Sequence, residues 1–188
     1  MKKTKSSKNL VPNLKRKYDE EIIPAMKERF GLKNSWEVPR LEKIVVNVGI
    51  GSGGQGEAWK QMEEDIKKIT GQAPVYTVAR KAISGFKVRE GMKVGMKVTL
   101  RGRRMWEFLE RIIVAAFPRI KDFQGIPKKN FDESGSVSVG IKEHVVFPEI
   151  NADEVNHTFG LQVSLVLKEG DKEKGIELMR LLGFPVQK

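Results

Sequence analysis

Residues Met92 to Arg101 read Met-Lys-Val-Gly-Met-Lys-Val-Thr-Leu-Arg, and apolar and polar side chains alternate along them. Because successive side chains of a β-strand point to opposite faces of the sheet, this pattern predicts a strand with two unlike faces. One face carries Val94, Met96, Val98 and Leu100, and the other carries Lys93, Lys97, Thr99 and Arg101. We expect the first face to join the core. The second, a row of cations around a hydroxyl group, suits a polyanion.

Segments on both sides of this strand show either the same alternation or a helical period. Within 43–49, for example, Ile44, Val46 and Val48 alternate with Lys43, Val45 and Asn47. Apolar residues that recur at i, i+3 and i+4 predict amphipathic helices elsewhere. The predicted strands are 43–49, 74–79, 92–101, 136–141 and 158–167, and the predicted helices are 12–30, one that ends at Gly71, 103–117 and one that Asp171 caps.

Strands that alternate cleanly are covered on one face only. The sequence therefore predicts an α+β fold, in which a mostly antiparallel sheet packs its helices on one face and leaves the other face open. A sheet face with amide, hydroxyl and cationic groups suits structured RNA. The side chains expected on this open face are Lys43, Asn47, Lys97, Thr99, Arg101, Gln162 and Ser164.

The 188 residues carry a net charge of +11, and this charge is concentrated in two segments. Residues 1–17 hold seven cations and no acid, and residues 80–104 hold nine cations and one acid. Clustered charge of this kind indicates a nucleic acid, an acidic membrane surface or an acidic protein as the partner. We expect a flexible basic tail over 1–11 and a single domain over 12–188.

Several classes of site lack the residues that they need. The chain has no cysteine, which excludes disulfides, thiolate zinc sites and cysteine nucleophiles. Its two histidines, His144 and His157, are not spaced as metal ligands or as part of a nucleophile–base pair, and we interpret both as structural. The acidic run 63–65 is interpreted as a solvated helix face. The longest apolar run, 112–117, is too short to cross a membrane. We therefore expect a cytosolic protein that is not an enzyme and that binds no cofactor or metal.

One motif favours a different function. Gly51-Ser-Gly-Gly-Gln-Gly56 satisfies the glycine pattern of a dinucleotide-binding turn. Such a site also needs an acidic residue about 20 positions further on, and no acid occurs between Asp65 and Glu90. An arginine would suit a phosphorylated dinucleotide, so this alternative stays open beside the simpler interpretation of a glycine loop.

The basic loop 80–91 combines two kinds of side chain. Ile83 and Phe86 lie among Arg80, Lys81, Lys87 and Arg89. Apolar side chains between cations can stack on bases or sugars while the cations hold phosphates. The loop therefore predicts nucleic-acid binding, without distinguishing RNA from DNA.

Seven motifs occur in order along residues 12–188. They are KIVVNVG at 43–49, ITGQAPV at 69–75, AISGFKVREG at 82–91, KVTLRG at 97–102, PRIKDFQG at 118–125, GIKE at 140–143 and FPEI at 147–150. Together they resemble the family of protein five of the bacterial large ribosomal subunit, the 5S rRNA-binding family.

This resemblance implies a non-catalytic scaffold whose concave sheet face turns toward RNA. It would dock 5S rRNA into the central protuberance of the large ribosomal subunit, beside large-subunit rRNA and the neighbouring 5S-associated ribosomal proteins. Family members contact a 5S rRNA loop through an Asn, a Gln and a Thr, which match Asn47, Gln72 and Thr99. Lys97 and Arg101 lie on the same expected face.

The resemblance implies two further contacts. The basic loop would meet the elbow of the P-site tRNA through Arg80, Lys81, Ser84, Phe86, Lys87 and Arg89. Loops in the second half would meet small-subunit ribosomal protein thirteen, and we place this contact at Ser134, Gly135, Ser136 and Lys142. The chain departs from the family pattern in its longer lysine-rich tail, in its glycine-rich loop and in His144, where a Gln is expected.

Overall fold

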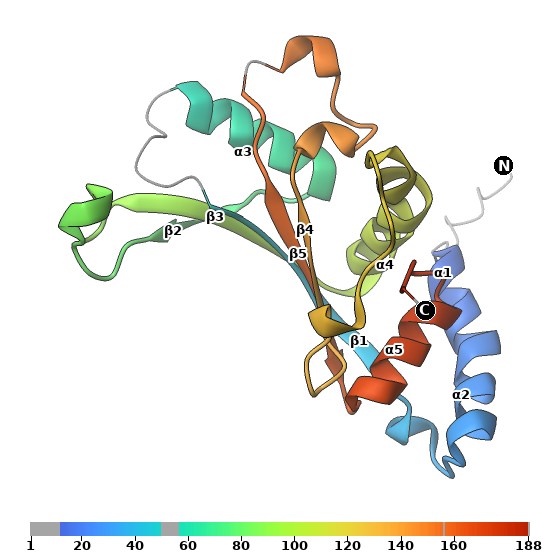
Figure 1. Ribbon diagram of the computed structural model, residues 1–188. Coiled ribbons are helices and arrows are strands. Elements are labelled where there is room, and N and C mark those ends of the chain that lie inside the picture. The colour runs from blue at the N-terminus through green and yellow to red at the C-terminus, as the bar shows by residue number, and fades with distance from the viewer. Residues whose placement is uncertain (1–11, 50–56, 156, 188) are drawn as a thin grey trace, which may run out of the picture.

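The computed structural model describes residues 12–49, 57–155 and 157–187. Its centre is a five-stranded sheet in the order β2-β3-β1-β5-β4, and every neighbouring pair of strands is antiparallel (Figure 1). The strands are β1 Arg40–Gly49, β2 Val75–Val78, β3 Lys93–Leu100, β4 Val137–Ile141 and β5 Leu161–Lys168. The predicted α+β fold with a mostly antiparallel sheet is confirmed.

Helices cover one face of the sheet, and the opposite face is open (Figure 1). Inward side chains of the strands, such as Ile44, Met96 and Leu165, are fully buried. They form one core with apolar side chains of the helices, among them Phe108 and Leu109. The helices are α1 Asn13–Lys17, α2 Ile23–Phe30, α3 Glu57–Thr70, α4 Gly102–Arg111 and α5 Lys172–Leu181.

A β-bulge interrupts the alternation of β3 near its start. Thr77 of β2 pairs with Gly95, but the next residue, Val78, pairs with Lys93, so Val94 is an extra residue in β3. A bulge of this kind shifts the residues before it to the opposite face of the sheet. Lys93 therefore does not share a face with Lys97.

The side chain of Lys93 confirms this shift. Its Nζ lies 3.8 Å from the centre of the Tyr76 ring, and that ring packs against Trp59 of α3. Lys93 thus lies on the helical side of the sheet, and its predicted place in the row with Lys97 and Thr99 is wrong. The sequence could not show the bulge, because it depends on the pairing of β3 with β2.

The interior contains a polar pair that the sequence analysis missed. Asp65 of α3 is only 4% exposed and His144 is 0% exposed. His144 stacks on Phe159 and accepts the Phe159 N–H at Nδ1, at 3.3 Å, while its Nε2 lies 3.5 Å from Oδ2 of Asp65. Burial lowers the pKa of His144, against the opposing influence of the Asp65 carboxylate. The interpretation of 63–65 as a solvated face is therefore wrong for Asp65, which packs against the core beside His144.

Candidate nucleic-acid interface

The open face of the sheet carries a row of side chains that crosses all five strands. Asn47 of β1 pairs with Lys97 on one side and with Gln162 on the other. Paired residues of neighbouring strands share a face, so their side chains stand next to one another. From β2 to β4 this first row consists of Val75, Lys97, Asn47, Gln162 and Gly140.

A second row lies two residues earlier along β1, at Val45. From β3 to β4 it consists of Thr99, Val45, Ser164 and Ser138. The hydroxyl groups of Ser138 and Ser164 are 2.9 Å apart, and the amide of Gln162 donates to the Ser164 hydroxyl at 3.5 Å. Ser138 and Val75 were not predicted on this face, although their places in alternating strands were a signal for both.

The structure brings Asn47, Gln72 and Thr99 to the same part of this face. Gln72 follows α3 in a turn where its N–H donates to the Thr70 hydroxyl at 3.3 Å. The Gln72 side chain then donates to the Thr99 carbonyl oxygen, also at 3.3 Å. Asn47 and Thr99 are exposed, and no other described residue forms a hydrogen bond with their side chains. These neutral groups are available to a partner.

The two cations of the predicted site differ in their surroundings. Lys97 is exposed in the first row, and the described part of the chain gives it no acidic partner. Arg101 instead donates to the carboxylate of Glu42 at 3.0 Å. This hydrogen bond lowers the pKa of Glu42 below its ordinary value. The charge of Arg101 is therefore partly compensated within the protein.

The basic loop is a short hairpin at the end of the arm formed by β2 and β3 (Figure 1). Ile83 and Val88 exchange backbone hydrogen bonds at 2.9 and 3.2 Å. Between them lies a 3-10 turn, Ser84–Phe86, which is followed by Lys87 with a φ of +53°. The loop residues named as contacts for tRNA are all exposed; they are Arg80, Lys81, Ser84, Phe86, Lys87 and Arg89.

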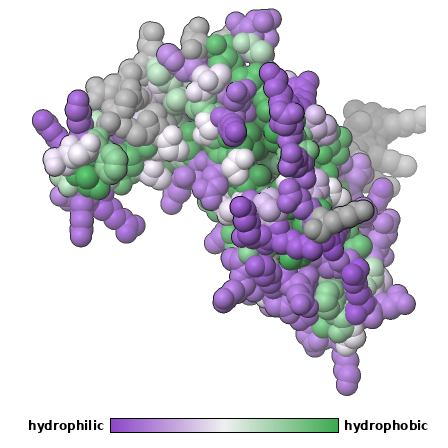
Figure 2. Space-filling model, in the orientation of Figure 1, coloured by the Kyte–Doolittle hydropathy of each residue, from purple (hydrophilic) through white to green (hydrophobic). Residues whose placement is uncertain are grey.

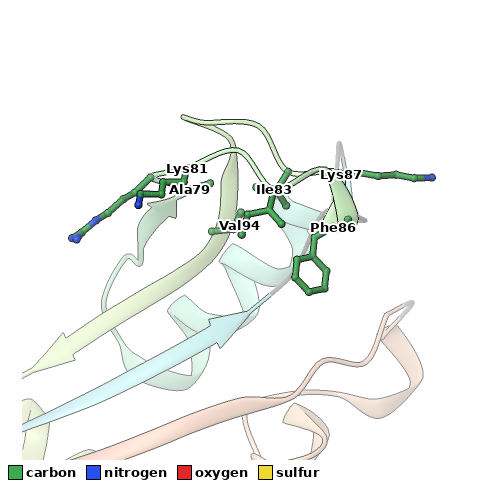
Figure 3. A pocket seen from close by; sticks show the side chains of 9 residues that line it. Ala79, Lys81, Ile83, Phe86, Lys87 and Val94 are labelled. Carbon is green, nitrogen blue, oxygen red and sulfur yellow. The ribbon is translucent and has the colours of Figure 1, made fainter.

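Apolar side chains of this loop line a hollow of about 820 Å³ (Figure 3). Phe86 is 70% exposed and Ile83 is 50% exposed, and both contribute to its wall together with Val94, the extra residue of the bulge. Lys87 points away from Val94 (Figure 3). Figure 2 shows the resulting hydrophobic surface at the tip of the arm, with hydrophilic side chains around it.

Two of the residues expected at the small-subunit contact pack against the rest of the protein. Gly135 is buried against α5: a Cβ atom added to it would lie 2.9 Å from the Cα of Gly175. The hydroxyl group of Ser136 accepts the N–H of Leu167 at 3.1 Å, so it ties β4 to β5. Both residues have roles in packing that the sequence did not indicate.

Ser134 and Lys142 are the exposed members of that group, and they lie beyond opposite ends of β4. The Ser134 hydroxyl donates to Asp132 at 2.8 Å within a tight turn. Lys142 follows the last residue of β4, which spans about 17 Å.

The described residues include no group of three or more His, Cys, Asp or Glu side chains that could hold a metal ion. None of the described helices is long and apolar enough to cross a lipid bilayer. The glycine motif 51–56 and the tail 1–11 lie outside the described residues. The antiparallel sheet nevertheless excludes the doubly wound parallel sheet that a dinucleotide fold needs, so that alternative is wrong.

Comparisons with known proteins give consistent matches. Residues 34–89 match the family model described as ribosomal protein L5, and residues 93–186 match the model that describes the C-terminus of the same ribosomal family. The large ribosomal subunit protein uL5 of Rubrobacter xylanophilus is 49% identical over 178 residues, which cover 93% of this chain and 98% of that protein. The protein of the same name from Carboxydothermus hydrogenoformans is 45% identical over 176 residues, with 93% and 98% covered. That from Pelagibacter ubique is 44% identical over 177 residues, with 94% and 96% covered.

Proposed function

The chain belongs to the ribosomal protein L5 family, and from this premise we propose that it binds 5S rRNA on the open face of its sheet and attaches that RNA to the large ribosomal subunit. Membership makes it a ribosomal protein of the large subunit, and thus of the cytoplasm, rather than an enzyme. Its partner class is accordingly ribosomal RNA.

Asn47, Gln72 and Thr99 lie close together beside Lys97, and this observation supports the proposal. An amide offers donors and an acceptor, and a hydroxyl offers both, so these side chains can pair with base edges and with the 2′-hydroxyl of RNA. Lys97 holds a phosphate but carries no sequence information. We assign recognition to the neutral groups and affinity to the cations.

The proposal extends to the basic loop and to the second half of the chain. The loop is the contact for P-site tRNA, because its exposed cations surround apolar side chains that can stack on a base or sugar. For small-subunit protein thirteen, the exposed Lys142 and Ser134 are the candidate contacts. Large-subunit rRNA and neighbouring 5S-associated ribosomal proteins complete the proposed surroundings.

A binding assay with 5S rRNA and an unrelated RNA of similar size tests the main proposal. The protein should retain 5S rRNA preferentially, and Asn47→Ala or Thr99→Val should weaken that binding by about 1–3 kcal/mol through RNA groups left unpaired. Asn13→Ala, on the exposed helical side, is the matched control and should bind as the wild type does. Equal retention of both RNAs at moderate salt would refute the proposal.

The assignment of the loop has its own test. Lys81→Glu should leave 5S rRNA binding unchanged and should weaken the binding of tRNA by the assembled ribosome. A loss of 5S rRNA binding in this variant would show that the loop belongs to the 5S site instead.

A further inference from the structure

One tryptophan of this chain is exposed, at the end of β1 away from the basic loop. Trp36 lies in a 3-10 turn, Ser35–Glu37, directly before β1 and is 67% exposed. The other two, Trp59 and Trp106, are 8% and 6% exposed. An indole ring has a large apolar surface that proteins normally bury, so its exposure marks a candidate contact site.

The position of Trp36 is held by its neighbours. The backbone N–H of Trp36 donates to the side-chain oxygen of Asn34 at 3.2 Å. The Arg40 guanidinium lies over the indole ring, 5.2 Å from its centre. A cation over one ring face leaves the second ring face as the exposed apolar surface. The ring is thus oriented before any partner arrives.

The cation over this ring, Arg40, has a second cation beside it on the open side of the sheet. Arg40 pairs with Lys168 of β5, and both side chains are exposed to a substantial degree. Glu169 lies 3.3 Å from Arg40 and 3.8 Å from Lys168, so it compensates part of their charge. Arginine has five N–H donors, and one carboxylate does not occupy all of them. Arg40, Lys168 and Glu169 together carry a net charge of +1, and the exposed Glu37 follows Trp36 in the turn.

The same cluster continues the open face that carries Asn47. Lys168, Val166, Ser164 and Gln162 alternate along β5, and their partners on β1 are Arg40, Lys43, Val45 and Asn47. Arg40 therefore shares a face with Asn47 despite the bulge of β1 between Leu41 and Lys43. Their partners on β5, Lys168 and Gln162, are six residue steps apart, so about 20 Å separates Arg40 from Asn47. One RNA lying along the face reaches both.

We propose that Trp36, Arg40 and Lys168 form a second RNA contact, in which an unpaired base of 5S rRNA stacks on the free face of the indole and the two cations hold adjacent phosphates. The inference rests on the proposed function, since it assigns a further part of the same RNA to the same sheet face. Continuity with the first row favours RNA over a protein partner at this ring. Stacking of a base on an aromatic side chain tolerates any base, so the site adds affinity and little specificity.

Substitution of the ring tests the contact. Trp36→Ala should weaken 5S rRNA binding on the order of 5- to 100-fold, while Trp36→Phe should retain most of it. Val114→Ala is the matched control, because Val114 is an apolar side chain that is 71% exposed on the helical segment after α4. It should leave the affinity unchanged.

Tryptophan fluorescence gives an independent measurement. Trp36 is the exposed indole among the three, so acrylamide should quench it selectively, and the difference between wild type and Trp36→Phe isolates its signal. Added 5S rRNA should quench that signal by stacking and should shield it from acrylamide.

If Asn47→Ala weakens 5S rRNA binding while Trp36→Ala and the fluorescence difference show no effect, the inference is overturned and the proposed function stands. Protection of Trp36 only after other subunit components are added would also overturn it. If the wild type fails to select 5S rRNA at all, the proposed function itself fails.

Discussion

His144 should make the stability of this protein depend on pH in a way that one substitution removes. Burial lowers the pKa of its imidazole below the usual value, and Asp65 and Glu143 act in the opposite direction. At a pH just below 6.5 the imidazole of residue 144 is therefore protonated to a greater extent in the unfolded chain than in the folded chain. The free energy of unfolding should fall as the pH is lowered through 6.5, until the lower pKa of the folded state is reached.

The imidazole of His144 is buried and hydrogen-bonded in its neutral form, and its unfolded pKa sets an upper limit on the effect. His144 is 0% exposed, stacks on Phe159 at 3.9 Å between ring centres and accepts its N–H. Protonation at Nδ1 would end that hydrogen bond. A histidine that stays neutral in the folded state while its unfolded counterpart titrates near 6.5 contributes about 1.4 kcal/mol between pH 7.5 and pH 5.5. This is the largest value that a group with such an unfolded pKa can give over that interval.

Urea unfolding of wild type and His144→Gln at both pH values measures the difference. The wild type should lose more stability than the variant when the pH falls from 7.5 to 5.5, by at most about 1.4 kcal/mol. His157 is exposed and present in both proteins, so its contribution cancels. Asp65→Asn removes an influence that favours the charged imidazole, and the loss should keep its sign. Equal losses, or a wild type that gains stability on acidification, would refute the reasoning and indicate a protonated His144 paired with Asp65.

Three further substitutions test packing, capping and charge. Gly175→Ala should destabilise the fold by about 1–3 kcal/mol, because its Cβ would lie 2.4 Å from the Cα of Gly135; an unchanged urea midpoint would contradict that contact. Asp171→Ala should cost about 1 kcal/mol, since the Asp171 side chain accepts the N–H of Lys174 at 2.9 Å at the start of α5. The same hydrogen bond lowers the pKa of Asp171. The difference in the free energy of unfolding between Asp171→Ala and the wild type should therefore shrink as the pH falls below about 3.9. A difference independent of pH would argue against a charged cap. Lys97→Gln should reduce the slope of log affinity for 5S rRNA against log salt by about 0.7–0.9, and a slope equal to that of the wild type would place Lys97 outside the contact.

The sequence predicted those features that depend on local periodicity. Alternation along 43–49 and 92–101 placed Asn47, Lys97 and Thr99 on the open face, because the face of a strand residue follows from its neighbours in the chain. The same rule failed for Lys93, where the pairing with β2 inserts a bulge. Local pattern is therefore a reliable guide only where the strand is regular.

Contacts between distant segments could not be predicted in the same way. Asp65 lies three residues after Met62 and four before Ile69, and this spacing places it beside the apolar stripe of α3. Its neighbour in the fold, His144, lies far along the chain and could not be predicted from that spacing. Gly135 looked like a loop residue, and only the approach of Gly175 explains its burial. Both cases depend on tertiary packing.

The strand order determines which parts of the sheet can pair first during synthesis of the chain. β1 is the central strand but comes first in the chain, and its two partners, β3 and β5, end at Leu100 and Lys168. At 5–20 residues per second, a ribosome needs roughly 3–14 s to make the segment between those two residues. During this time β1 can pair with β3, so Asn47, Gln72 and Thr99 are in place while the other edge of β1 still lacks its partner. An unpaired central strand is prone to join other chains. The half of the sheet that should recognise RNA is therefore made first, and the half that protects it from aggregation is made last.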